Sequence, residues 1–152
     1  MNDLSILFKN EHLTFDDVLL VPSYSNLKSR LDPDISTEVG GISLDVPIIS
    51  SPMDTVTEDY MAISIGLNGG MGIIHRFMTV EKQILLLRKV SRSYELGGNK
   101  VPVVPAIGVG DKERTRLSRI LEGIIPYSID AVAIDIANGH SSLMKDMVKF
   151  VR

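Results

Sequence analysis

Polar side chains follow four short apolar runs in this sequence, in positions where an α/β protein can bind a ligand. These stretches are Ser50 to Glu58, His75 to Phe77, Gly108 to Gly110 and Asp135 to Ser141. Ligands of parallel α/β folds bind at the carboxyl ends of the strands, so we predict that the four stretches meet at one rim. Asp135 is the most informative residue, because a carboxylate that ends an apolar strand is costly to bury unpaired and can accept hydrogen bonds from ribose hydroxyls.

Each stretch also has a purely structural interpretation when it is taken alone. Ser51 could cap a helix, and Gly108 could turn the chain. His75 at the end of a strand is more often a hydrogen-bonded structural histidine than a catalyst. The functional prediction therefore depends on whether the four stretches come together.

Composition excludes several other kinds of site. Cysteine is absent, so these residues hold no disulfide, no thiolate metal ligand and no cysteine nucleophile. The three histidines are scattered, and we expect no metal site. Gly108-Val-Gly110 is followed by Asp111-Lys-Glu113, which matches neither the dinucleotide-binding glycine fingerprint nor a Walker A loop.

Charge and hydrophobicity are those of an ordinary globular protein. Of the 152 residues, 44% are hydrophobic and 23% charged, and the formal net charge of -3 gives no general attraction for nucleic acid. The first residues lack the basic start and continuous apolar run of a secretion signal, and no later stretch approaches transmembrane length. We therefore expect a cytoplasmic protein that binds a small molecule and neither nucleic acid nor membrane.

Four buried parallel strands are expected to position the rim. Each is nearly continuous in apolar character, and the predicted strands are Val46–Ser50, Met71–His75, Val101–Ala106 and Ala131–Asp135. Their starts recur about every 25 to 30 residues, which is the length of one βα unit. This periodicity fits an open doubly wound sheet or half of a closed barrel, and a complete barrel needs about 250 residues.

Helices between the strands carry start signals and an apolar face. Thr79, Asp111 and Ser141 precede helical patterns. The residues expected to face the core are Val80, Ile84 and Leu87, then Leu117, Ile120, Leu121 and Ile124, and finally Met144, Met147, Val148 and Val151.

The first 45 residues do not show this alternation. We predict that residues 1–45 form an N-terminal arm and lead-in segment, with a loop or extended stretch from Pro22 to Ser36. Residues 46–152 would then contain the βα units.

Three motifs resemble those of one family, the IMP dehydrogenase/GMP reductase family. Leu13 to Pro22 (LTFDDVLLVP) and Ser50 to Glu58 (SSPMDTVTE) resemble its two opening motifs, and Gly69 to His75 (GGMGIIH) resembles its second-strand motif. The resemblance implies an α/β fold, a parallel (β/α)8 TIM barrel of which this chain supplies about the first four units. It also implies a homotetramer, or a complementing C-terminal half-barrel as partner.

The resemblance further implies an NAD(P)-dependent oxidoreductase acting on a purine nucleoside monophosphate. The dehydrogenases oxidise IMP to XMP with NAD, whereas the reductases convert GMP to IMP with NADPH and release ammonia. Both use a catalytic cysteine, which the resemblance would place beyond Arg152, so this segment alone is expected to be inactive. A non-catalytic half-barrel that needs a partner chain is the alternative class.

The same likeness assigns candidate contacts. Ser51 and Met53 are implied to bind the purine nucleotide, and the residues implied to contact the cofactor are Ser29, Arg30, Arg76, Asp135, Ile136 and Ala137.

Several features favour the reductase and NADPH over NAD. Arg92 to Lys100 connects two units directly, where many dehydrogenases insert a regulatory domain. Asp135 to Gly139 (DIANG) resembles the reductase form of its motif, and guanidinium groups suit the 2′-phosphate that NAD lacks. Ser50 to Glu58, by contrast, is closer to the dehydrogenases.

Overall fold

The computed structural model describes residues 13–93 and 100–152, and these fall into two units that are divided between Asp34 and Ile35. In the first unit, the short 3-10 helix η2 (Phe15–Asp17) begins after Thr14, whose backbone N–H donates to Asp17 Oδ2 at 2.8 Å. Between Pro22 and Ser36 the chain forms turns and extended backbone, as predicted.

The second unit begins with a hairpin that the sequence analysis did not predict. Strands β1 (Thr37–Val39) and β2 (Ile42–Leu44) pair antiparallel. Gly40 and Gly41 join them with φ of 60° and 80°, the left-handed conformation that two-residue hairpin turns require and that glycine adopts without strain. Leu44 is buried and packs in a small cluster that also contains Met71 and Val104.

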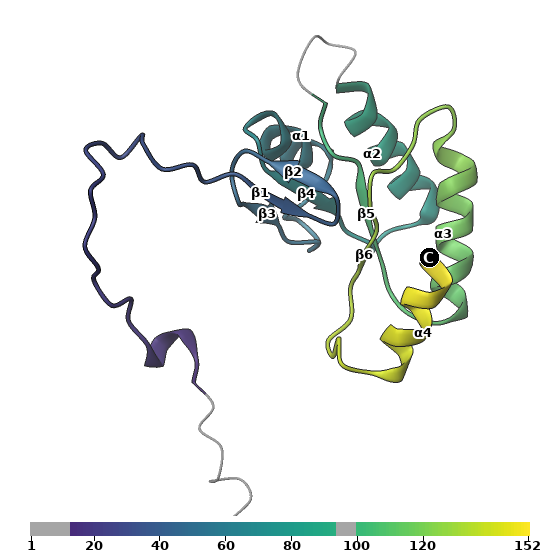
Figure 1. Cartoon of the computed structure of the whole chain (residues 1–152). Helices are drawn as coiled ribbons and strands as arrows, with labels where there is room; N and C mark the ends of the chain where they lie inside the picture. The colour runs from purple at the N-terminus through teal and green to yellow at the C-terminus, as the bar shows by residue number, and fades with distance from the viewer. Residues whose placement is uncertain (1–12, 94–99) are drawn as a thin grey trace, which may run out of the picture. The chain divides into compact units, whose positions relative to one another are not determined.

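A four-stranded parallel sheet forms the centre of this unit (Figure 1). Its strands are β3 (Ile49–Ser50), β4 (Met71–Ile74), β5 (Val104–Ile107) and β6 (Ala133–Ile134). They lie in sequence order, each hydrogen-bonded to the next, as in a barrel and unlike the reversed order of a doubly wound sheet. The structure therefore confirms an α/β fold with the first four strands of a TIM barrel.

Strand β5 begins three residues later than predicted. Pro102 has no N–H to donate to a neighbouring strand, and the Val103 N–H donates to the Asp130 side chain at 2.9 Å. The regular ladder therefore starts at Val104.

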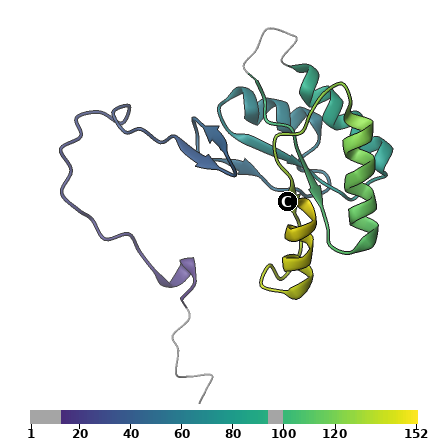
Figure 2. The same cartoon turned by 45° about the vertical axis from the view of Figure 1, so that its right-hand side comes forward.

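In the part of the chain that the structure describes, α1 (Asp59–Leu67), α2 (Val80–Arg92) and α3 (Asp111–Ile124) connect the strands, and α4 (Ser142–Val151) comes after the last strand. Helices α1, α2 and α3 lie in a row along one side of the sheet, and α4 follows β6 (Figures 1 and 2). Thr79 and Ser141 are N-caps whose side chains accept hydrogen bonds from Lys82 and Met144, as predicted. For α3 the prediction was one residue off, because Gly110 is the N-cap and Asp111 is the first helical residue.

The main core lies between the helices and the sheet. Leu87, Ile120 and Met147 are fully buried there, as expected. Leu121 was wrongly assigned to the core, since it is 47% exposed. Gln83 is buried instead, although its polarity had excluded it from the predicted apolar face.

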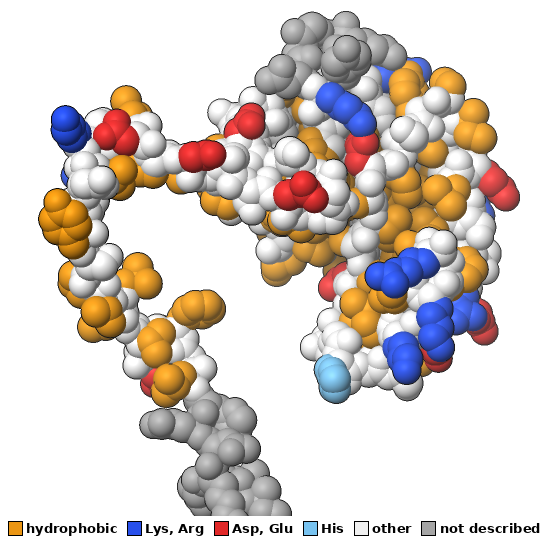
Figure 3. Space-filling model, viewed as in Figure 1, with side chains coloured by type: hydrophobic (Ala, Val, Ile, Leu, Met, Phe, Trp, Pro, Cys, Tyr) orange, Lys and Arg blue, Asp and Glu red, His pale blue; other side chains and the backbone are white. Residues whose placement is uncertain are grey.

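The surface of the second unit is mixed. Figure 3 shows hydrophobic side chains at the surface of the viewed face, among charged groups of both signs. At the edge of the sheet, Ile48 just before β3 and Ile49 within it retain 56% and 39% exposure. Within residues 13–93 and 100–152, no helix is both long enough and apolar enough to cross a membrane.

Candidate functional site

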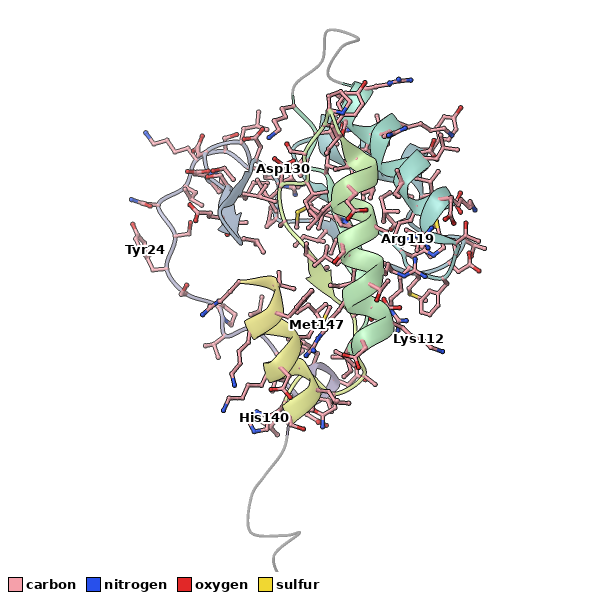
Figure 4. All side chains as sticks on the ribbon, turned by 90° about the vertical axis from the view of Figure 1, so that its right-hand side faces the viewer. Tyr24, Lys112, Arg119, Asp130, His140 and Met147 are labelled. Carbon is pink, nitrogen blue, oxygen red and sulfur yellow. The ribbon has the colours of Figure 1, made fainter. Side chains whose placement is uncertain are left out.

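The predicted rim exists, because four parallel strands end at the same edge of the sheet. Ser51 follows β3, Arg76 lies just beyond β4, Gly108 follows β5 and Asp135 follows β6. Figure 4 shows His140, which follows β6, at the opposite end of the second unit from Asp130, which precedes this strand. The structure thus brings residues that are far apart in sequence to one edge.

The loop after β3 is anchored by a buried threonine. Thr57 is completely buried, and its hydroxyl donates to the Ser51 carbonyl at 2.5 Å and lies 2.9 Å from Ser50 Oγ. Thr55 has φ of 63°, a left-handed conformation that is uncommon for residues other than glycine. Ser51 and Met53 are both exposed on this loop, where a ligand can reach them.

His75 joins this loop to the end of β4. Its Nε2 lies 3.6 Å from Asp54 Oδ1 and 3.5 Å from Glu58 Oε1, and the ring is almost completely buried. The hydrogen bond from Lys82 Nζ to Glu58, at 2.7 Å, is the main reason why the pKa of Glu58 lies below its ordinary value, and His75 also lowers this pKa.

Asp54, Glu58 and His75 are close enough to hold a metal ion, and the sequence analysis did not anticipate this cluster. However, His75 Nδ1 accepts a hydrogen bond from the Phe77 N–H at 3.1 Å. The neutral ring therefore carries its proton on Nε2, the nitrogen that faces the two carboxylates. In this state the buried Nε2 faces the two carboxylates without making a hydrogen bond, and it has no lone pair available for a metal.

Arg76 and Asp135 lie against each other at the rim. Arg76 Nε donates to Asp135 Oδ2 at 3.2 Å, and the two side chains retain 29% and 33% exposure. The Arg76 guanidinium also stacks over the Phe77 ring, 4.8 Å from its centroid. Sequence reasoning assigned Arg76 and Asp135 to the cofactor separately and did not foresee that they pair with each other.

A buried polar network supports this part of the rim, and sequence reasoning missed it. Gln83 donates to the Ala106 carbonyl at 2.8 Å and accepts a hydrogen bond from Arg116 at 3.0 Å. Arg116 pairs with Glu113, whose other carboxylate oxygen accepts the Gly108 N–H at 2.7 Å. The network thus links α2, β5 and α3 to the turn that follows β5.

The remaining candidates are placed less distinctively. Ile136 is half-buried and Ala137 exposed, directly after Asp135. Ser29 and Arg30 belong to the first unit, where the Ser29 N–H donates to Asp32 Oδ2 at 3.0 Å.

A parallel sheet in sequential order, with polar groups gathered at its carboxyl edge, defines a barrel-type α/β protein, a class whose ligands bind at that edge. The chain belongs to the IMP dehydrogenase/GMP reductase family, because the family model described as "IMP dehydrogenase / GMP reductase domain" matches residues 12–152.

Relatives with both names are similar to part of the chain. Inosine-5′-monophosphate dehydrogenase of Nitrosopumilus maritimus is 50% identical over 84 residues, 55% of this chain and 18% of that protein. The Bacillus subtilis dehydrogenase is 51% identical over 87 residues, 57% of this chain and 18% of its own length. GMP reductase of Leishmania donovani is 46% identical over 84 residues, 55% of this chain and 17% of its own length. The matched segment therefore covers less than a fifth of each of these relatives.

Proposed function

We propose that this chain forms the first half of the catalytic barrel of an NAD(P)-dependent purine-nucleotide oxidoreductase. Ser51 and Met53 bind the purine nucleotide, and the segment from Asp135 to Ala137 binds the cofactor. The arrangement of Arg76 beside Asp135 supports this proposal most directly, because it combines a phosphate-binding fork with a ribose-binding carboxylate. These groups fit a nicotinamide dinucleotide, whose nicotinamide donates or accepts a hydride when it is bound.

The reaction that we propose is the reduction of GMP to IMP with NADPH. A hydride is added at C2 of the purine, the 2-amino group leaves as ammonia, and protons from water balance the charge. A covalent step at C2 needs a thiolate, and these 152 residues contain no cysteine. We therefore propose that the thiolate belongs to the second half of the barrel, within a homotetramer or in a complementing chain.

IMP dehydrogenase is the second candidate, with IMP, NAD and water converted to XMP and NADH. The Ser50 to Glu58 motif and the similarity to dehydrogenases of Nitrosopumilus maritimus and Bacillus subtilis favour it. The Asp135 to Gly139 motif and the guanidinium of Arg76 favour the reductase. A half-barrel that binds nucleotides without catalysis is the alternative from a different class.

Nuclear magnetic resonance of the isotope-labelled chain tests this proposal. GMP is expected to shift the amide signals of residues 51–58, and NADPH those of Arg76 and residues 135–137. NADH and IMP serve as matched ligands: tighter binding of NADPH and GMP supports the reductase, and the reverse preference supports the dehydrogenase. Shifts confined to the amino end of the sheet, near Lys100 and Asp130, would contradict the proposed site.

A further inference from the structure

The Arg76–Asp135 ion pair crosses the sheet above a glycine. Arg76 follows β4 and Asp135 follows β6, so that β5 and Gly108 lie between them. A Cβ atom on Gly108 would lie 3.3 Å from Arg76 Cζ and 3.0 Å from Glu113 Cγ, closer than most side-chain contacts. The missing side chain at Gly108 thus leaves the space through which Arg76 reaches Asp135.

The charges around this glycine balance within the chain. Arg76 pairs with Asp135 at 3.2 Å, and Arg116 pairs with Glu113 at 3.5 Å. Glu113 also accepts the Gly108 N–H, so this backbone donor is already used by a carboxylate. Arg76 and Arg116 are therefore each neutralised by a carboxylate of the same chain.

We propose that Asp135 is a specificity-determining residue that acts through Arg76, as its internal counter-ion. A ligand phosphate that binds the Arg76 guanidinium competes with the negative charge of the Asp135 carboxylate, which already accepts from Arg76 Nε, whereas a ligand without that phosphate leaves the pair intact. Both side chains are about one-third exposed, so a ligand can reach either of them. This inference rests on the proposed function, and it predicts that Asp135 weakens the preference for a 2′-phosphorylated cofactor that Arg76 creates.

Two matched probes isolate the 2′-phosphate: adenosine 2′,5′-bisphosphate and adenosine 5′-monophosphate. The ratio measured is the affinity of the full chain for the bisphosphate divided by its affinity for the monophosphate. It is measured for the wild type, for Asp135→Asn, for Arg76→Gln and for the double variant. Asp135→Asn is expected to raise the ratio about tenfold, which corresponds to roughly 1.4 kcal/mol. Arg76→Gln is expected to bring the ratio close to one, and adding Asp135→Asn to Arg76→Gln is expected to change it little.

Asp130→Asn is the matched control, because it removes the same charge at the amino end of the sheet, where Asp130 pairs with Lys100. It is expected to leave the ratio unchanged. Two results would overturn the inference and leave the proposed function standing. One is that Asp130→Asn raises the ratio as much as Asp135→Asn does, and the other is that Asp135→Asn raises the ratio by the same factor in the Arg76→Gln variant. If neither probe shifts any rim amide in any variant, the proposed cofactor site is wrong, and this inference is wrong with it.

Discussion

Replacing Gln83 with methionine is expected to destabilise the second unit strongly, although the change is small in shape. Gln83 is completely buried on α2, and its amide donates to the Ala106 carbonyl and accepts from Arg116. Methionine has a similar length and helix propensity, so that the substitution removes mainly the hydrogen bonds.

The expected loss follows from the buried groups that lose a hydrogen bond to the Gln83 amide. The Arg116 guanidinium, only 16% exposed, loses its amide acceptor, and the Ala106 carbonyl loses one donor. A buried polar group that loses its partner costs about 1–3 kcal/mol, so the free energy of unfolding should fall by about 2–5 kcal/mol. This is a large part of the 5–15 kcal/mol that is typical of folded domains.

Urea unfolding followed by circular dichroism measures this loss. The variant Gln83→Met/Arg116→Met is the control, since it also removes the guanidinium that loses its amide acceptor in the single variant and otherwise contacts Glu113 and the Met78 carbonyl. It should cost less than the sum of the two single substitutions. A loss below about 0.5 kcal/mol for Gln83→Met would refute the reasoning, because that is the range of ordinary surface substitutions.

Three further predictions concern packing, charge and activity. Gly72→Ala should lower the free energy of unfolding in urea by about 1–3 kcal/mol, because a Cβ atom at this position would lie 2.4 Å from Ala62 Cα. Gly139→Ala is the control and should have little effect, because a Cβ atom there would have no atom within 4 Å. The Lys82 hydrogen bond lowers the pKa of Glu58, so its contribution to stability is complete above the ordinary glutamate pKa and is lost as the pH falls through the lowered pKa. Lys82→Met should therefore raise the titration midpoint of Glu58, measured by NMR of its carboxyl group. An unchanged midpoint would contradict this. The chain alone should convert neither GMP with NADPH nor IMP with NAD, as measured by the absorbance of the nicotinamide. An active chain would show that no cysteine is needed.

The position of the candidate residues could be predicted from the sequence, because strand ends follow directly from hydrophobic pattern. Once the strands are parallel and sequential, residues such as Ser51 and Asp135 must lie at the same edge. The caps Thr79 and Ser141 were also predictable, since each makes its hydrogen bond within one turn of its own helix.

Contacts between distant elements were not predictable in this way. Gln83 is buried because Arg116, from another helix, and a strand carbonyl satisfy its amide, and neither partner is visible in the local pattern of α2. The hairpin was different: Gly40-Gly41 between two short runs is a recognised turn signal that the sequence analysis overlooked. The family match covers both the dehydrogenases and the reductases, so it does not select one reaction.

Pairing of Arg76 with Asp135 changes how sequence differences between related enzymes translate into cofactor preference. If each residue contacted the cofactor independently, replacing one would leave the contribution of the other intact. In the ion pair, however, Asp135 acts on a phosphate through Arg76, so that removal of Arg76 also removes the effect of Asp135. The effects of the two residues are therefore not additive. It follows that an arginine introduced at position 76 beside an unchanged Asp135 should confer only part of the preference for a 2′-phosphorylated cofactor, and that Asp135 and Gly108, which shape the pair, belong to the same determinant.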